Sequence, residues 1–275
     1  MVGYDRIREG LQSQGLRQPH LGDLIAYWLS VLTIQARAQP RQCEWESLAQ
    51  QANARLRAGQ PILQWHDIQI NPLTLAILCH QICITTGKHF PRWAPALEAI
   101  RDWLCQEHQA LLSFAESFWN EGRIRQGEQA GLPGALLTFV FNQALHPTLR
   151  KYARMLGSMV DESMWYRPFC PVCGGIPDLG ALEPKTGERK LLCARCDTEW
   201  NFWRLTCSFC GTDEPDQLRY QSTDTPGYLR CVCTSCGKQL PTLDLRQWTY
   251  EPLLVVERNL MLTMDLFKES IALSM

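Results

Sequence analysis

Hydrophobic side chains in the first 160 residues recur with the period of an α-helix. One stripe, at the i, i+3, i+4, i+7 spacing of a single helix face, consists of Leu21, Leu24, Ile25, Trp28, Leu29 and Leu32, and Gln39-Pro40 ends this run. A second stripe, which predicts two abutting helices, consists of Leu97, Ile100, Leu104, Leu111, Phe114 and Phe118. Further helices are predicted at residues 43–58, 72–85, 132–144 and 147–159. The pattern predicts a bundle of about seven amphipathic helices.

The remainder of the chain has the pattern of short strands followed by a helix. Strands are predicted at residues 190–193, 200–206, 228–231 and 240–245, each beside a pair of cysteines. An amphipathic helix is predicted from about Pro252 to Leu273. We therefore expect a multidomain α plus small β protein, with a helical bundle at residues 1–160 and a cysteine-rich domain with a C-terminal helix at residues 161–275.

Eight of the thirteen cysteines form four Cys-x-x-Cys pairs. The pairs are Cys170/Cys173, Cys193/Cys196, Cys207/Cys210 and Cys233/Cys236. A Cys-x-x-Cys turn directs two sulfurs at one metal ion, and two such turns complete a tetrahedral site. The 19 residues between Cys173 and Cys193 and the 22 between Cys210 and Cys233 are near zinc-ribbon spacing, which favours sequential pairing. Spacing also permits an interleaved arrangement, with the first pair joining the third. We expect two metal ions, iron or zinc, each bound by four thiolates.

The residue that follows each pair supports metal-binding turns. Gly174, Gly211 and Gly237 directly follow the second cysteine of three pairs. A sharp turn beneath a metal ion often needs a positive φ at that position, which glycine adopts without strain. Asp197 follows the remaining pair, and Asp tolerates the left-handed region. The sequence therefore predicts a left-handed residue in all four turns.

A disulfide framework is the alternative interpretation of so many cysteines. The chain does not begin with an apolar signal peptide, and single cysteines are scattered at positions 43, 79, 83 and 105. Both features fit a reducing cytoplasm, where disulfides are rare. We therefore favour metal sites over disulfides and expect a cytoplasmic protein. Cys79 and Cys83 share a helix face and are interpreted as core residues.

Cys231 is the odd thiol of the cysteine-rich domain. The spacing Cys231-Val-Cys233 is too tight for the two sulfurs to form a turn of the Cys-x-x-Cys kind. Two interpretations remain open. Cys231 is either a packing residue or a spare ligand that exchanges with Cys233.

The net charge of the chain indicates which classes of partner it can attract. A net charge of −1, with 20% charged residues, gives little attraction to nucleic acid or anionic membranes, and the nearly apolar run Leu132 to Phe141 is too short to span a bilayer. A nucleic-acid-binding zinc ribbon presents Lys and Arg to phosphate. Residues 161–275 instead hold 12 Lys plus Arg against 16 Asp plus Glu, a net charge of −4, whereas residues 1–160 carry +3. We expect neither a nucleic-acid partner nor a membrane span.

The sequence contains none of the common catalytic motifs. A Gly-rich phosphate loop, a nucleophile elbow and a His-Glu-x-x-His motif are all missing. Four thiolates also close a metal site and leave no position for a substrate. We therefore expect a protein that is not an enzyme. A rubredoxin-like electron carrier or redox sensor remains an alternative, because four-thiolate iron sites transfer single electrons.

The cysteine-rich sequence resembles a known family. The runs CPVCGGIP (170–177), LLCARCDTEWNFWRLTCSFCG (191–211) and YLRCVCTSCGKQLPTLDL (228–245) are similar to the C-terminal half of the formate dehydrogenase accessory protein FdhE family. The run HLGDLIAYWLSVLTIQARAQ (20–39) is similar to an early helix of that family. The resemblance implies a helical bundle followed by two tandem rubredoxin-like, four-cysteine metal modules. It also implies that the eight paired cysteines are the ligands.

The resemblance further implies a function. Proteins of this family take part in maturing formate dehydrogenase, a molybdenum or tungsten enzyme, by contact with its catalytic subunit in the cytoplasm. We expect this contact in a cleft between the helical bundle and the metal modules. Two departures leave another complex redox enzyme open as the client. A Pro- and Leu-rich N-terminal arm is missing, and the ending around residues 263–269 matches the family only in part.

Overall fold

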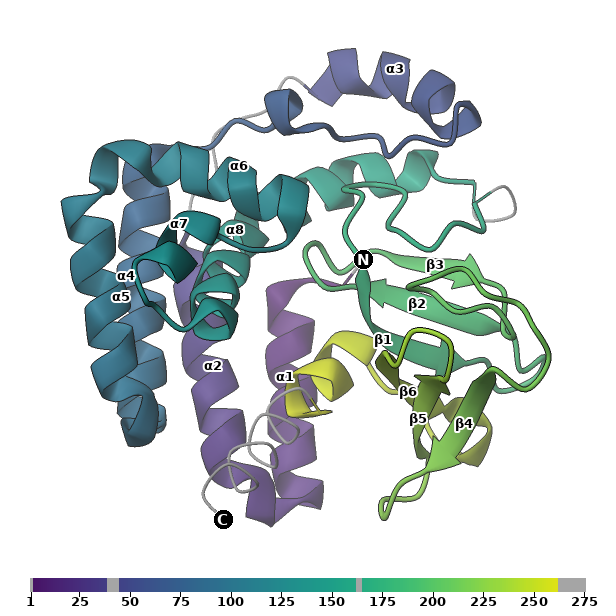
Figure 1. Ribbon diagram of the computed structural model, residues 1–275. Helices are drawn as coiled ribbons and strands as arrows, with labels where there is room; N and C mark the ends of the chain where they lie inside the picture. The colour runs from purple at the N-terminus through teal and green to yellow at the C-terminus, as the bar shows by residue number, and fades with distance from the viewer. Residues whose placement is uncertain (1, 39–44, 162–164, 262–275) are drawn as a thin grey trace. The chain divides into compact units, whose positions relative to one another are not determined.

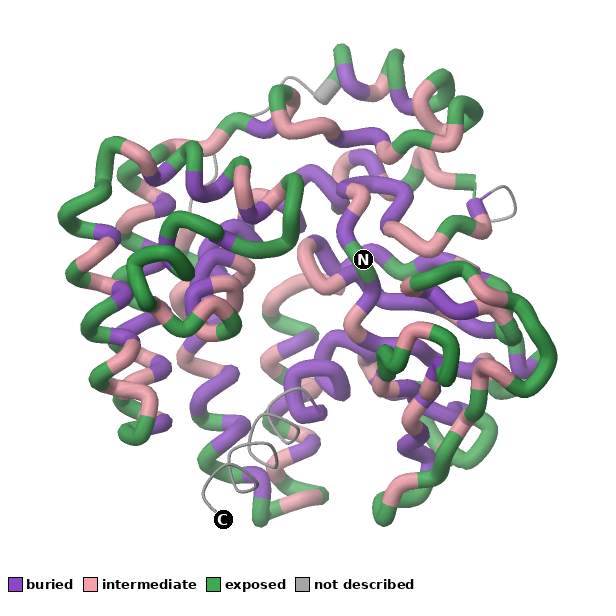
Figure 2. Tube along the Cα trace, viewed as in Figure 1, coloured by how far each residue is buried: buried purple, intermediate pink, exposed green. Residues whose placement is uncertain are grey.

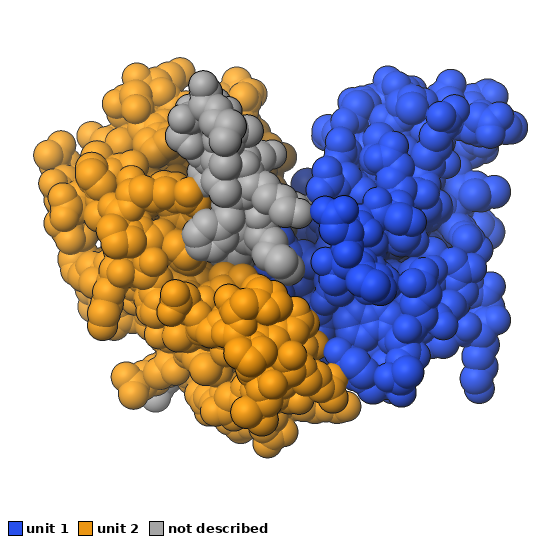
Figure 3. Space-filling model, turned by 90° about the horizontal axis from the view of Figure 1, so that it is seen from below, with its two compact units in different colours: residues 1–2, 45–63, 153–275 blue, residues 3–44, 64–152 orange. Residues whose placement is uncertain are grey.

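The computed structural model describes residues 2–38, 45–161 and 165–261. The chain divides into two compact units, which Figure 3 shows in different colours. The helical unit consists of residues 3–44 and 64–152. The metal unit consists of residues 1–2, 45–63 and 153–275. The metal unit therefore takes a segment, residues 45–63, from the N-terminal part of the sequence.

Helices make up most of the chain before residue 160 (Figure 1). The α-helices are α1 Tyr4–Arg17, α2 Gly22–Arg37, α3 Trp45–Arg57, α4 Pro72–His89, α5 Ala94–Gln106, α6 Leu111–Glu121, α7 Arg125–Gln129 and α8 Gly134–Leu156. Short 3-10 turns lie at η1 Pro19–Leu21, η2 Trp65–Asp67, η3 Pro91–Trp93, η4 His108–Ala110, η5 Gly157–Met159 and η6 Leu245–Gln247. Within the described residues, none of the helices combines the length and apolar composition that crossing a bilayer requires.

The predicted helix faces form the core of the helical unit. Buried side chains in this core include Leu24, Ile25, Trp28, Leu32, Leu97, Ile100, Leu104, Leu111, Phe114 and Phe118. The stripe from Leu97 to Phe118 does belong to two helices, α5 and α6. In α2 the buried Tyr27 hydroxyl lies 3.1 Å from Thr86 Oγ1 of α4, so a hydrogen bond links these two helices. The hydrophobic periodicity therefore predicted both the helices and the side chains that they bury.

One helix boundary was predicted wrongly. The sequence predicted separate helices at residues 132–144 and 147–159, whereas α8 continues through Pro147. Proline inside a helix removes one backbone hydrogen bond and costs about 3 kcal/mol. Leu145 and Leu149, on either side of Pro147, are almost completely buried. Burial of these neighbours offsets the cost, because each fully buried leucine contributes about 1.5–3 kcal/mol.

A single six-stranded sheet forms the centre of the metal unit. The strands are β1 Pro177–Leu182, β2 Arg189–Cys193, β3 Glu199–Phe202, β4 Leu218–Ser222, β5 Tyr228–Cys233 and β6 Gln239–Asp244, in the order β3-β2-β1-β6-β5-β4. Neighbouring strands are antiparallel except for the central pair, where β1 and β6 run parallel. Each half of the sheet repeats the order cysteine pair, two strands, cysteine pair, strand. The metal half is thus a duplicated ribbon whose two copies share one sheet.

Two strands were absent from the sequence-based prediction. The first is β1, whose sequence PDLGAL contains a proline and a glycine, and the second is β4, whose sequence LRYQS is largely polar. Strand β1 is buried along most of its length, whereas β4 is partly or fully exposed throughout (Figure 2). The other four strands lie where the cysteine pairs predicted them. The composition of these two segments is not typical of strands, so the sequence did not predict the central strand β1 or the edge strand β4.

The C-terminal helix begins at Leu254 and is described as far as Met261. Every residue from 254 to 261 is buried. The predicted continuation to Leu273, and the departures from the family around residues 263–269, lie outside the described residues.

A substitution at Gly180 in β1 tests how the two halves of the sheet are joined. A Cβ atom at Gly180 would lie 3.0 Å from Oγ1 of Thr242, which pairs with it across the β1–β6 contact. We expect Gly180→Val to lower the free energy of unfolding by about 1–3 kcal/mol, because the parallel strands must separate. Urea denaturation measures this change. Gly157→Val is the control, since none of the residues that the structure describes places an atom within 4 Å of a Cβ there, and equal losses would contradict the prediction.

Candidate metal centre

All four cysteine pairs adopt the same turn. The backbone N–H four residues after the first cysteine donates to that cysteine's carbonyl, with N–O distances of 2.9, 3.3, 3.0 and 2.9 Å in chain order. The N–H of the first cysteine donates to the carbonyl five residues later, at 2.8, 2.9, 2.8 and 3.0 Å. Each turn, called a knuckle below, is closed twice by its own backbone. The repeated Cys-x-x-Cys sequence therefore forms the same backbone turn four times.

The predicted left-handed residue is present in every knuckle. Gly174, Gly211 and Gly237 have φ values of 69°, 76° and 72°. Asp197 occupies the same position in the second knuckle with φ of 59°. A left-handed conformation costs a residue with a Cβ about 1–2 kcal/mol, so the second knuckle needs a compensating interaction.

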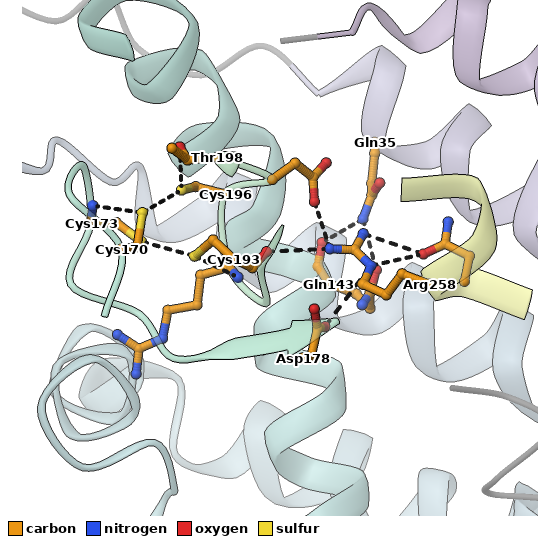
Figure 4. A network of polar contacts seen from close by, with 12 residues as sticks. Gln35, Gln143, Cys170, Cys173, Asp178, Cys193, Cys196, Thr198 and Arg258 are labelled. Carbon is orange, nitrogen blue, oxygen red and sulfur yellow. Dashed lines mark hydrogen bonds and ion pairs between the residues drawn. The ribbon is translucent and has the colours of Figure 1, made fainter. Parts of the chain in front are cut away.

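The knuckles meet in sequential order. Cys170, Cys173, Cys193 and Cys196 form the first cluster, and Cys207, Cys210, Cys233 and Cys236 form the second. Within each cluster all four sulfurs lie within 4.8 Å of one another. Adjacent sulfurs are separated by 3.4 and 3.6 Å in the first cluster and by 3.7 and 3.8 Å in the second (Figure 4 shows the first). The interleaved arrangement is not the one observed.

These distances fit a metal ion better than they fit disulfides. Four sulfurs about 2.3 Å from a zinc ion lie about 3.8 Å apart at the corners of a tetrahedron. A disulfide needs sulfurs about 2.05 Å apart, and none of the described cysteines forms one. In three knuckles a backbone N–H also points at a cysteine sulfur, from Cys173, Arg195 and Phe209. The donor set is that of a soft four-thiolate site, and the clusters could each hold one metal ion.

The first cluster is fully enclosed. All four of its cysteines are buried. Backbone N–H groups of Ile62 and Leu63 donate to the carbonyls of Pro171 and Val172, at 2.9 and 2.8 Å, so residues 62–63 lie along the first knuckle. Burial raises the pKa of Cys170 well above that of an exposed thiol. Because ligation requires thiolates, metal binding at this cluster would release protons to solvent.

A buried ion pair supports the second knuckle. Arg258, from the C-terminal helix, donates to Asp197 Oδ1 at 2.6 Å and to the Cys193 carbonyl at 3.4 Å (Figure 4). Its Nε lies 3.9 Å from Oδ2 of Asp178 in β1. Burial raises the pKa of Asp178 to about 6, although Arg258 opposes the rise. Arg258 thus holds the one knuckle that lacks glycine, an interaction that the sequence pattern did not reveal.

The same helix also reaches the second half of the sheet. Glu257, next to Arg258, accepts a hydrogen bond of 2.6 Å from the hydroxyl of Tyr228 in β5. Both residues are buried. Two adjacent charged residues of the helix therefore fasten it to both copies of the ribbon. Sequence reasoning missed them, although a Glu-Arg-Asn run inside an apolar helix is a signal that something pairs with it.

The second cluster is open on one side. Cys207 and Cys233 are buried, whereas Cys210 is exposed and Cys236 is intermediate. Cys210 and Cys236, the two more accessible residues, are the second cysteine of each knuckle. Burial raises the pKa of Cys207 to about 12, while the backbone N–H of Thr212 lowers the pKa of Cys210 to about 7. Each cluster has four cysteine ligands of its own, but the two clusters differ in how far their surroundings bury those ligands.

Cys231 lies outside both clusters. Its sulfur is 3.7 Å from Nη1 of Arg189, whose guanidinium is buried, contacts the Tyr220 hydroxyl and donates to the Thr206 carbonyl. The Arg189 guanidinium also lies over the ring of Phe202, 5.0 Å from its centroid. Arg189 belongs to the first copy of the ribbon and Cys231 to the second. Cys231 therefore lies at the junction of the two copies, and its role as a packing residue or a spare ligand stays a prediction.

The described single cysteines of the helical unit belong to neither cluster. Cys79 and Cys83 are buried in α4, and burial raises the pKa of Cys83 to about 12. Cys105 is exposed at the end of α5, and Cys43 lies outside the described residues. The packing interpretation of Cys79 and Cys83 agrees with their burial.

Comparison with known proteins shows which family the chain resembles. A family model described as "FdhE, central domain" matches residues 169–204, which contain the first two knuckles. A protein FdhE homolog from Aquifex aeolicus is 26% identical over 202 residues, which cover 72% of this chain and 66% of that protein. One from Haemophilus ducreyi is 35% identical over 119 residues, 42% of this chain and 38% of that protein.

The chain is similar to proteins of the FdhE family. The matched segments span two thirds or less of these relatives' own length. The fold also matches the crystal structure of the FdhE protein from Pseudomonas aeruginosa, with a TM-score of 0.55 and 20% sequence identity. That match covers 97% of this chain and 91% of the other. The FdhE resemblance of the sequence, and the helical region followed by four-cysteine modules that it implied, are confirmed.

Removal of Arg258 tests the buried ion pair. We expect Arg258→Met to lower the free energy of unfolding by about 3–5 kcal/mol, because it leaves the buried Asp197 carboxylate without its partner. Urea denaturation at pH 7 measures the loss. Lys190→Ala is the matched control, since Lys190 pairs with Glu183 at 3.2 Å on a partly exposed part of the sheet, where about 0–1 kcal/mol is expected. Similar losses in both variants would contradict the assignment.

Serine substitutions test the role of Cys231. Because Cys231 is engaged by Arg189, we expect Cys233→Ser and Cys236→Ser each to bind one metal ion per chain instead of two. Metal analysis of the purified variants gives this ratio, and Cys231→Ser should retain two ions. Two ions in Cys233→Ser, but one in Cys236→Ser, would instead show that Cys231 replaces Cys233 as a ligand.

Proposed function

We propose that this chain is an accessory protein for the maturation of a formate dehydrogenase, a molybdenum or tungsten redox enzyme, and that it binds the catalytic subunit of that enzyme in the cytoplasm. Similarity to the FdhE family supports the proposal, because the segment that matches the FdhE central domain, residues 169–204, contains the first cluster itself. The eight paired cysteines would bind two metal ions of the iron or zinc type. The ions would hold the metal unit in the conformation that meets the client.

The chemistry of the clusters supports a role outside catalysis. Each cluster already supplies four sulfur ligands, which satisfies a tetrahedral ion and leaves no coordination position for a substrate. Ligation would supply folding energy on the order of 10 kcal/mol per site, in addition to the apolar side chains that the sheet buries. Metal binding would therefore determine whether the metal unit can present a stable surface to a partner.

A pull-down under anaerobic conditions tests client binding. The bait is this chain, and the probe is the purified catalytic subunit of the formate dehydrogenase from the same organism. We expect the wild type to retain the subunit, and a variant with Cys173→Ser and Cys210→Ser to retain roughly tenfold less, which corresponds to about 1.4 kcal/mol of binding free energy.

Cys105→Ser serves as the matched control, because Cys105 is exposed and lies outside both clusters. It should retain the subunit as the wild type does. Retention of no subunit by the wild type, or equal retention by the cluster variant, would refute the maturation role.

One observation favours a second candidate function, a rubredoxin-like electron carrier or redox sensor. The exposed side of the second cluster would bring an iron ion near solvent, where an electron partner could approach. This candidate requires iron with a reversible visible absorption change on reduction. Zinc in both clusters, established by metal analysis of anaerobically purified protein, would exclude it.

A further inference from the structure

The two clusters have the same ligands and the same backbone turns. Each consists of two Cys-x-x-Cys knuckles closed by the same pair of hydrogen bonds, and the sulfur separations differ by only a few tenths of an ångström. The intrinsic affinity of four thiolates for an ion is therefore similar in both. Any difference in behaviour must come from what surrounds the sulfurs.

The segments that cover the two clusters differ. The first cluster is covered by residues 61–63 along one knuckle and by the Arg258–Asp197 ion pair along the other. The corresponding knuckles of the second cluster have no such cover in the described part of the chain. Phe209, within the third knuckle, is partly exposed and has Lys238 over its ring, 5.2 Å from the centroid.

Equivalent glycines give an independent measure of this space. A Cβ at Gly174, in the first cluster, would lie 3.1 Å from Pro61. A Cβ at Gly211 or Gly237, the matching positions of the second cluster, would meet no atom of the described residues within 4 Å. Both knuckles of the second cluster therefore border open space, and the exposed Cys210 and intermediate Cys236 lie at that opening.

The rate at which a metal ion bound by four thiolates exchanges depends on how easily an entering ligand can reach it. An entering thiolate or chelator donor forms a bond to the metal while one cysteine sulfur leaves and takes a proton from solvent, so the metal keeps its oxidation state throughout. This step needs the entering donor to reach the ion. At the second cluster it can attack beside Cys210 in the folded protein, whereas at the first cluster the covering segments must first open.

We propose that the second cluster is an exchangeable site for a soft divalent metal ion, open to small thiols and chelators, and that the first cluster is a permanent structural site. The inference rests on the metal-binding part of the proposed function and not on client binding. It assigns different roles to two sites with identical ligands. The metal load of the chain would then respond to metal and thiol levels through Cys207, Cys210, Cys233 and Cys236 alone.

Metal release to a chelator tests the assignment. The full chain, loaded with two zinc ions, is mixed with excess 4-(2-pyridylazo)resorcinol under native conditions, and the coloured complex is followed with time. We expect one equivalent to leave on the order of 100-fold faster than the other, because local opening costs far less free energy than opening of a buried core. The slow phase should accelerate with added urea, and the fast phase should not.

Alkylation of the intermediate identifies the site without any substitution. Iodoacetamide is added after the fast phase, and the modified cysteines are located by mass spectrometry. We expect modification of the second-cluster cysteines and protection of Cys170, Cys173, Cys193 and Cys196, with the exposed Cys105 modified at every stage as an internal control. A single phase of two equivalents, or modification of the first cluster, would overturn the inference alone. Failure to bind any metal would overturn the metal assignment of the proposed function as well.

Discussion

The convergence of four thiolates on one point is the constraint on which the metal unit depends. Two sulfurs of one knuckle can meet two of another only if the chain between them returns to its starting point, and a hairpin does this. Strand β2 ends at Cys193 and strand β5 ends at Cys233, so each hairpin delivers its knuckle directly from the sheet. Ligation, strand register and the left-handed turn residues are therefore parts of one geometric requirement.

The duplicated ribbon gives the metal unit two clusters that are suited to different roles. The two copies share a sheet through the parallel β1–β6 pair, and Arg189 and the C-terminal helix connect them by polar contacts. The first copy lies deeper, since β1 and β2 are mostly buried and residues 62–63 pair with its knuckle. The second copy ends in the exposed strand β4. Identical ligands thus sit in different dielectric and steric surroundings, which suits one site for structure and the other for exchange.

Much of the candidate site could be read from the sequence, because its information is local. Spacing within Cys-x-x-Cys defines a knuckle, and the next residue must accept a positive φ, which Gly174, Gly211, Gly237 and Asp197 all do. Helix faces are local in the same way, since a period of 3.6 places neighbouring residues on one side. Where local signals conflicted with packing, as at Pro147 in α8, the local prediction was wrong because burial of the flanking residues offset the proline penalty.

The sequence by itself determined the eight paired cysteines, the turn at each pair, most helices and strands, and the resemblance to the FdhE family. Only the tertiary structure decided that the pairs join sequentially, that one cluster is enclosed and the other open, and that Arg258 and Glu257 fasten the final helix to both copies of the ribbon. The physical reason is sequence distance. A knuckle is fixed by five adjacent residues, whereas the cover over a sulfur comes from segments such as residues 61–63, more than 100 positions away, whose approach is set by packing and leaves no periodic trace in the chain.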